Sequence, residues 1–238
     1  MNIIETRQLY FKYGKSLILQ DINLEIEQGS IYGYLGKNGA GKTTTLKILV
    51  GLLANYKGHI LFYGKDFYSN RIDNLHKIGN MIERPSLYDH FTVYQQLKYL
   101  DIFFKKGDKR IDEVLGLTGL KNEGNKKIKY LSTGMKQRLG IGMSLFHDPD
   151  LLILDEPING LDPEGVYDVR QLLLRMQESG KTIILSSHIL SEIEKICTHV
   201  GILDKGRLVY QGRMKELLLS TQNDNLEDIF INIISNEK

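Results

Sequence analysis

The sequence predicts an α/β fold in which helices cover both faces of a parallel β-sheet. From Leu151 onward, apolar runs of strand length alternate with amphipathic segments of helical length. Strands that are apolar throughout and alternate with helices are typical of a parallel sheet buried on both faces. A second observation is a glycine-rich loop between a predicted strand at Ile31–Leu35 and a predicted helix at Thr43–Leu53.

Length and composition limit the classes of protein to which the chain can belong. A length of 238 residues allows one domain or two small ones, at roughly 100–200 residues per domain. The net charge of +2 gives no bulk argument for nucleic acid or anionic lipid as a partner. The single cysteine, Cys197, cannot form an internal disulfide, which is consistent with a reducing compartment. We expect no signal peptide, and no run approaches the about 20 apolar residues of a membrane helix.

Apolar periodicity predicts the remaining elements. Alternation near the N-terminus predicts half-buried strands that include Ile22–Ile26 and Ile60–Phe62. From about Arg84 to Tyr130 the chain is predicted to be helical, with segments at Val93–Phe104 and Ile111–Leu117. Beyond it we expect helices at Met135–Phe146, Gly165–Ser179 and Ile189–Cys197, and strands at Leu151–Leu154, Thr182–Leu185 and Val200–Leu203.

The C-terminal segment has the pattern of a separate amphipathic helix. Its apolar residues fall at helical spacing, at Leu226, Ile229, Phe230, Ile233 and Ile234. Such helices usually pack on the body of their own protein, which is the interpretation that we favour. Contact with a partner or with a second copy of the chain is the alternative.

The glycine-rich loop is a phosphate-binding motif. Gly36–Thr43 matches G-x-x-x-x-G-K-[ST], in which glycines let successive N–H groups point at phosphate oxygens and the following helix adds its positive end. Lys42 is expected to reach the β- and γ-phosphates, and the Thr43 hydroxyl to ligate Mg²⁺. The candidate ATP-binding residues here are Gly36, Asn38, Gly39, Ala40, Gly41, Lys42, Thr43 and Thr44. The motif indicates a nucleoside triphosphate but not what its energy drives.

Two carboxylates follow the predicted strand Leu151–Leu154. Because a carboxylate is costly inside an apolar sheet, Asp155 and Glu156 at a strand end beside a phosphate loop indicate chemistry. Asp155 can hold Mg²⁺, and Glu156 can polarise the attacking water as a general base. A strand end that simply reaches solvent is the alternative.

Between these motifs, Leu131–Gln137 reads LSTGMKQ and resembles the LSGGQ signature of ABC (ATP-binding cassette) ATPases. The resemblance extends from about Tyr10 to Gln211. It implies a single domain over 1–238 with the P-loop NTPase ABC ATPase fold: a RecA-like parallel-sheet core, an N-terminal antiparallel β-subdomain and an inserted α-helical subdomain. The implied boundaries are 1–83 and 136–215 for the core with its β-subdomain, 84–135 for the helical subdomain with the signature, and 216–238 for a C-terminal helical tail.

The resemblance also implies an ATP sandwich between two subunits, as a homodimer or pseudo-dimer. Ser132, Thr133 and Gly134 would face the ATP of the opposite subunit, where a hydroxyl, glycine N–H groups and a helix end suit an anion. Without the family, Ser132 is only a good helix N-cap. Thr133 and Met135 depart from the family's Gly and Gln, and a β-branched Thr disfavours positive φ. The loop that would cross the dimer carries Asn159, Gly160 and Asp162.

Two further site residues rest on the resemblance. His188, at the end of a predicted strand, matches the family's switch histidine, which would contact the γ-phosphate and position the water. A lone histidine is otherwise more often structural. Tyr13 matches the aromatic residue that stacks on adenine, although Tyr10 and Phe11 are rivals for that role.

Glu83 occupies a position where most family members carry Gln. The family residue ligates Mg²⁺ and links the core to the part that contacts the transporter, so Glu83 would add a negative charge there. With the nearby Pro85, it resembles the subgroup that exports, or confers immunity to, lantibiotics and bacitracin-like peptides.

The function implied by the resemblance is ATP hydrolysis that powers transport through separate integral membrane permease subunits. The protein would be cytoplasmic and peripheral on the inner face of the cell membrane, with ATP and Mg²⁺ as cofactors and no nucleic acid partner. Arg84–Leu100 is the expected surface for the permease. One alternative is a soluble ABC-type ATPase for iron–sulfur assembly or translation. Another is a module that pairs on ATP without hydrolysing it, against which Glu156 and His188 both argue.

Overall fold

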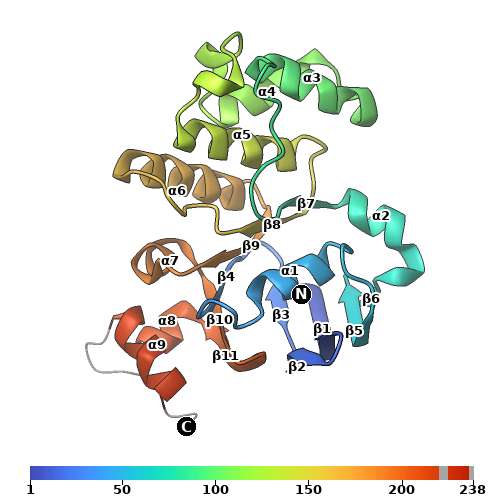
Figure 1. Cartoon of the computed structure of the whole chain (residues 1–238), viewed down its shortest axis with the longest axis vertical. Helices are drawn as coiled ribbons and strands as arrows, with labels where there is room; N and C mark the ends of the chain where they lie inside the picture. The colour runs from blue at the N-terminus through green and yellow to red at the C-terminus, as the bar shows by residue number, and fades with distance from the viewer. Residues whose placement is uncertain (220–224, 236–238) are drawn as a thin grey trace.

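The computed structural model describes residues 1–219 and 225–235, and its centre is a six-stranded sheet (Figure 1). The strand order is β11-β10-β4-β9-β8-β7, and every pair is parallel except β10 with the edge strand β11. The strands are β4 (Ile31–Gly36), β7 (Ile78–Met81), β8 (Leu151–Asp155), β9 (Thr182–Ser187), β10 (His199–Asp204) and β11 (Arg207–Arg213). The predicted α/β class with a parallel sheet is confirmed.

The central sheet is buried on both faces, as its continuous apolar strands predict. Along β8, Leu152 and Leu154 belong to one hydrophobic cluster, whereas Leu151 and Ile153 belong to another. The first cluster includes side chains of α5 (Thr133–Leu145), α6 (Pro163–Glu178) and α7 (Leu190–Ile196). The second includes α1 (Lys42–Leu49) and the antiparallel sheet of the N-terminal part. Side chains of one strand therefore alternate between two layers.

The antiparallel sheet is built mainly from the first 66 residues. Its strands are β1 (Asn2–Tyr13), β2 (Ser16–Ile22), β3 (Glu25–Glu27), β5 (Tyr56–Phe62) and β6 (Lys65–Asp66), in the order β2-β1-β5-β6 with β3 paired to β1. The prediction of one strand over Ile22–Ile26 is wrong, because the chain breaks between β2 and β3. The Thr6 hydroxyl bridges the break by donating to Ile22 O (2.8 Å) and accepting from Leu24 N (2.8 Å).

The middle of the chain forms the helical group at the top of Figure 1. This group follows β7 in the chain and contains α3 (Val93–Phe104), α4 (Asp108–Leu117), η2 (Lys121–Glu123) and η3 (Ile128–Tyr130). Two shorter helices, η1 (Tyr68–Asn70) and α2 (Arg71–His76), come earlier in the chain, after β6 and before β7. Helices α3, α4 and α5 share a third hydrophobic cluster, to which α5 contributes Leu139. This cluster spans Val93 to Phe146, so it extends beyond the boundary at 135 that we predict for the helical subdomain.

Two predicted helix boundaries are wrong, one by four residues and one by two. Helix α1 ends at Leu49 rather than Leu53, because Gly51 takes a positive φ of 73° that closes the helix. Leu52 consequently lies outside the helix and is 63% exposed. Helix α5 begins at Thr133 rather than Met135, so two signature residues lie within its first turn.

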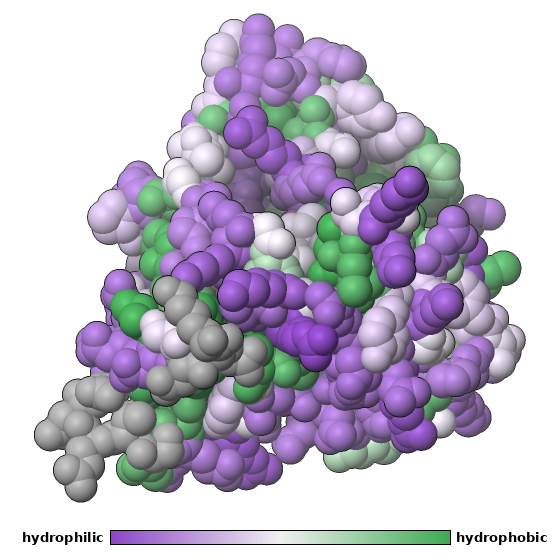
Figure 2. Space-filling view, turned by 60° about the horizontal axis from the view of Figure 1, so that its bottom comes forward, coloured by the Kyte–Doolittle hydropathy of each residue, from purple (hydrophilic) through white to green (hydrophobic). Residues whose placement is uncertain are grey.

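The C-terminal helix α9 (Leu226–Ser235) packs on the body of the protein, which is the interpretation that its apolar spacing favours. Leu226 and Ile229 are buried in the same cluster as α7, and α8 (Met214–Leu219) adds Leu217. Residues 220–224 and 236–238 of the predicted tail lie outside the described residues. Hydrophilic residues cover most of the face seen in Figure 2. Within 1–219 and 225–235, no helix has both the length and the apolar character needed to cross a membrane.

Candidate nucleotide-binding and catalytic site

The candidate site lies where three neighbouring parallel strands end. Strand β4 runs into the phosphate loop, β8 ends at Asp155, and β9, which lies between them, ends one residue before His188. Their register pairs Leu35 with Ser187 and Asp155 with Ser186. Carboxyl ends of parallel strands meet at one edge of a sheet, so residues far apart in sequence become neighbours.

Glycines of the phosphate loop allow a backbone path that other residues would obstruct. Gly39 and Gly41 have positive φ angles of 81° and 112°. A Cβ atom on Gly36 would lie 2.5 Å from the carbonyl oxygen of Leu203, and one on Gly41 would lie 2.6 Å from Cδ2 of Leu19. Only glycine fits at these points of the loop. Because glycine has no side chain, the N–H groups of the loop remain accessible to an anion.

Lys42 reaches back over the loop from the first position of α1. Its Nζ donates to Gly36 O (2.7 Å) and Lys37 O (3.3 Å), which leaves one of its three donors for another acceptor. Burial lowers the pKa of Lys42, whereas the nearby charges of Glu156 and Asp155 raise it. Phosphate oxygens would favour the charged ammonium in the same way as these carboxylates.

A hydrogen-bond network joins the phosphate loop to the acidic strand end. Thr43 Oγ1 donates to Asp155 Oδ2 (2.8 Å), and Ser186 Oγ donates to Asp155 Oδ1 (2.5 Å). The same Ser186 oxygen accepts from Glu156 N (2.9 Å). Asp155 is only 5% exposed, so these two hydroxyl donors compensate the burial of its charge.

Glu156 and His188 face each other beside this network. His188 Nδ1 lies 2.8 Å from Glu156 Oε2, and the Glu156 side chain is 24% exposed. Glu156 has a positive φ of 51°, a strained conformation for a non-glycine residue. A partly exposed carboxylate held against an imidazole can polarise a water molecule and position it for attack.

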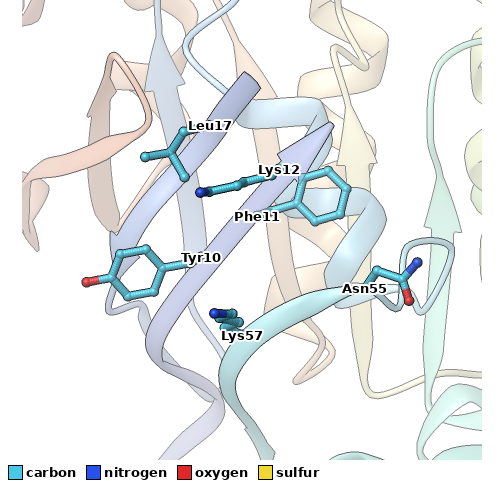
Figure 3. Close-up of a pocket in the computed structure, with 6 residues that line it drawn as sticks. All are labelled: Tyr10, Phe11, Lys12, Leu17, Asn55 and Lys57. Carbon is cyan, nitrogen blue, oxygen red and sulfur yellow. The ribbon is translucent and has the colours of Figure 1, made fainter. Parts of the chain in front are cut away.

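A pocket of about 470 Å³ contains most of the predicted ATP-binding residues. It is lined by Tyr13, Ile18, Asn38, Gly39, Gly41, Lys42, Thr43, Thr44, Glu156, Asn159 and His188. Tyr10 and Phe11, the rivals of Tyr13, instead line a different hollow, also bordered by Leu17 (Figure 3). Ala40 is 5% exposed and holds the loop in place by accepting from Gly206 N (3.0 Å).

The signature residues lie at an exposed helix start, away from this pocket. Ser132 caps α5 by accepting from Met135 N (3.2 Å), and Thr133 lies in the first helical turn without a positive φ. The stiffness of Thr therefore imposes no backbone strain here. A Cβ on Gly134 would lie 3.4 Å from Cα of Gly165 in α6, so the two helix starts approach closely.

The predicted coupling loop leads from the pocket to α6. Asn159 lines the pocket, and Gly160 has a positive φ of 71°. Asp162 caps α6 by accepting from Gly165 N (2.9 Å). Asn159, Gly160 and Asp162 are all exposed, as contact with another subunit would require.

Glu83 lies just beyond β7, the strand next to β8, but it does not contact the Thr43–Asp155 pair. Its Oε1 accepts from Lys47 Nζ at 2.6 Å, and the Glu83 side chain is 66% exposed. The hydrogen bond and charge of Lys47 lower the pKa of Glu83. Of the three predicted Mg²⁺ ligands, the structure thus brings Thr43 and Asp155 together. Glu83 instead forms an ion pair with Lys47 of α1.

The oxygen atoms of Thr43 and Asp155 suit a magnesium ion. Mg²⁺ prefers hard oxygen ligands and is usually held by one or two carboxylates together with substrate phosphates. Among the described residues, no group of three or more His, Cys, Asp or Glu side chains forms a metal site. A single hydroxyl–carboxylate pair beside a phosphate loop therefore fits Mg²⁺ bound with a nucleotide.

Sequence reasoning alone missed three residues at this site. Ser186 binds both acidic residues, Ile18 lines the pocket, and Lys47 holds Glu83. Ser186 could have been found from its place at the end of a strand beside the phosphate loop. Lys47 follows Thr43 by one helical turn, which places both side chains on the same side of α1.

Comparison with known proteins agrees with this geometry. The family model described as "ABC transporter" matches residues 19–159. The chain is 45% identical over 212 residues to the bacitracin transport ATP-binding protein BcrA of Bacillus licheniformis, covering 87% of this chain and 68% of that protein. It is 40% identical over 236 residues to the lantibiotic transport ATP-binding protein SrtF of Streptococcus pyogenes, covering 99% of each.

Solved structures of ABC proteins also resemble it throughout. An ATP-binding subunit of an ABC transporter aligns with a TM-score of 0.85 at 25% identity, covering 98% of this chain and 99% of that one. The cbiO1 protein of Clostridium perfringens, part of the ABC transporter complex cbiONQ, aligns at 0.83 and 34% identity, covering 92% and 91%. The expected ABC ATPase fold is confirmed, and the assembly alternative gains no support. The chain belongs to the ABC transporter family, as an ATP-binding and ATP-hydrolysing subunit.

Proposed function

We propose that this subunit powers the efflux of antimicrobial peptides of the lantibiotic or bacitracin type, or immunity to them, through separate membrane subunits. The full-length similarity to a lantibiotic transport protein carries the proposal. The similarity to a bacitracin transport protein and Glu83 in place of the family's Gln support it further. The subunit would work at the inner face of the membrane.

Two copies would form the working ATPase by enclosing ATP between them. The pocket that holds Lys42 contains no signature residue among its described lining, whereas Ser132 and Thr133 are exposed on the same chain. A second subunit can therefore present its signature helix start to the pocket. Its N-terminal end would bring positive dipole charge to the γ-phosphate.

Hydrolysis would use the residues that the strand ends bring together. Thr43 and Asp155 would hold Mg²⁺, which supplies positive charge to the β- and γ-phosphates when bound. Glu156 would accept the proton of the attacking water, and His188 would hold Glu156 in position through the 2.8 Å contact. Tyr13 would stack on the adenine, with Ile18 as an apolar neighbour.

The membrane subunit would dock where the segment after Glu83 meets the helical group. A groove of about 280 Å³ lies between this segment and helices α3 and α5, with Arg84, Pro85 and Leu100 among its lining residues. Next to it, the rings of Tyr88 and Tyr99 are in contact (5.6 Å between centroids) and partly exposed. Exposed aromatic rings beside a groove are typical of protein interfaces.

Co-purification followed by reconstitution would test the proposal. The tagged subunit would be isolated with its membrane partner, the complex placed in proteoliposomes, and ATP hydrolysis measured with a lantibiotic, with bacitracin and without peptide. We expect peptide-stimulated turnover in the parent complex and none in Glu156→Gln. Recovery of the subunit with ribosomes or scaffold proteins instead of a permease would contradict the proposal, as would turnover that neither peptide changes.

A further inference from the structure

The Lys47–Glu83 ion pair links the phosphate-loop helix to the segment that leads to the helical group. Lys47 Nζ donates to Glu83 Oε1 at 2.6 Å. The hydrogen bond to Glu83 is the main cause of a raised pKa at Lys47. A negative charge that the family's Gln would lack is therefore neutralised by a neighbouring residue.

The pair lies beside the candidate magnesium site. Lys47 is one turn after Thr43 on α1, and Thr43 donates to Asp155 at 2.8 Å. Thr43 and Lys47 therefore lie on the same side of α1, the side from which Thr43 reaches Asp155. Glu83 follows β7, which pairs with β8, so both carboxylates come from the same edge of the sheet.

Glu83 is held loosely enough to change partner. Its side chain is 66% exposed, and water screens exposed ion pairs strongly. Its backbone has a positive φ of 65°, a conformation that costs energy in a non-glycine residue and that occurs at sites which switch. A divalent cation next to the pair can therefore compete with one lysine for this carboxylate.

We propose that Lys47 and Mg²⁺ compete for the Glu83 carboxylate, so that Lys47 sets how much Mg²⁺ the ATP-bound site requires. Lys47 is thus a positioning residue that acts through Glu83. The inference rests on the proposed ATPase function and on the metal-ligand role that the family resemblance implies for Glu83.

A double-mutant cycle on ATP binding tests the competition without relying on turnover. All variants would carry Glu156→Gln, and binding of a fluorescent ATP analogue would be titrated with Mg²⁺. Lys47→Met preserves the aliphatic stem and should lower the Mg²⁺ concentration at half-saturation about threefold, in keeping with an exposed ion pair. Glu83→Gln should raise it. In the Glu83→Gln background, Lys47→Met should have little further effect.

A matched ion pair away from the site provides the control. Lys181 Nζ donates to Asp148 Oδ1, also at 2.6 Å and with similar exposure. Lys181 comes just before the first residue of β9, whereas the candidate site lies at the other end of that strand. Lys181→Met should leave the Mg²⁺ titration unchanged. Equal shifts by Lys47→Met in both Glu83 backgrounds would overturn the inference, since they would show simple repulsion between Lys47 and the ion. No effect of Glu83→Gln alone would instead refute the proposed role of Glu83 itself.

Discussion

Ser186 is the residue whose replacement tests the architecture of the site most directly. Its hydroxyl donates to Asp155 and accepts from the backbone N–H of Glu156, at 2.5 and 2.9 Å. Ser186 is fully buried, so Ser186→Ala removes two hydrogen bonds, one buried and one partly buried, around two acidic residues. One of them is charge-assisted, a class that contributes about 1.5–3 kcal/mol, and the other is an ordinary bond of about 1 kcal/mol.

The expected loss of stability is about 3 kcal/mol. For a chain of this size, each kcal/mol lowers Tm by roughly 2–4 °C, so Ser186→Ala should lower Tm by about 6–12 °C. The loss of a residue that orients a metal ligand typically costs 10- to 100-fold in activity or metal affinity. We therefore expect ATP hydrolysis by the purified chain to fall at least about tenfold, measured as phosphate release at saturating ATP and Mg²⁺.

Ser187→Ala is the matched control. Ser187 is equally buried, and within residues 1–219 and 225–235 its hydroxyl accepts from Ile189 N alone (3.0 Å) and bonds neither Asp155 nor Glu156. Its replacement should lower Tm by about 2–4 °C and leave hydrolysis within about twofold of the parent. If Ser186→Ala behaved no differently from Ser187→Ala in both assays, the inferred role of Ser186 would be refuted.

Three further predictions concern nucleotide, turnover and pH. Tyr13→Ala should weaken binding of a fluorescent ATP analogue about 5- to 100-fold, the effect of losing a stacked ring, whereas Tyr10→Ala should change it less than about twofold; equal effects would reject Tyr13. Glu156→Gln should lower turnover at least about 100-fold while ATP binding persists, and should leave an ATP-dependent dimer detectable by size-exclusion chromatography; retained turnover would exclude Glu156 as the base. Burial lowers the pKa of His147, whose ring stacks on Phe104. As the pH drops below the usual pKa of 6.5, this histidine takes up its proton in the unfolded chain before it does so in the folded chain. Stability should therefore fall as pH drops through 6.5, and urea unfolding at pH 7.5 and 5.5 should show a smaller fall for His147→Gln; equal falls would contradict the assignment.

Local sequence signals predicted most elements and the ends of the strands that carry the chemistry. The apolar run before Asp155 and the glycines of Gly36–Gly41 act through steric rules that hold in any context. The end of α1, which closes at Gly51, was a local signal that we did not use, whereas the break between β2 and β3 depends on a longer-range contact. The break between β2 and β3 is bridged by the side chain of Thr6, some 16 residues away, and no local pattern contains that information.

The sequence by itself determined that this protein holds a nucleotide, because the phosphate loop needs only glycine conformations, one ammonium and one hydroxyl at fixed spacing. The apolar strand that ends at two carboxylates also indicated Asp155 and Glu156, and the resemblance to a family indicated the histidine. The tertiary structure alone decided which residues meet. The strand order places β9 between β4 and β8, and this order brings Ser186 to Asp155 and His188 to Glu156. The tertiary structure also decided that Glu83 pairs with Lys47. A contact between residues 36 positions apart depends on how the strands pair and not on any local spacing.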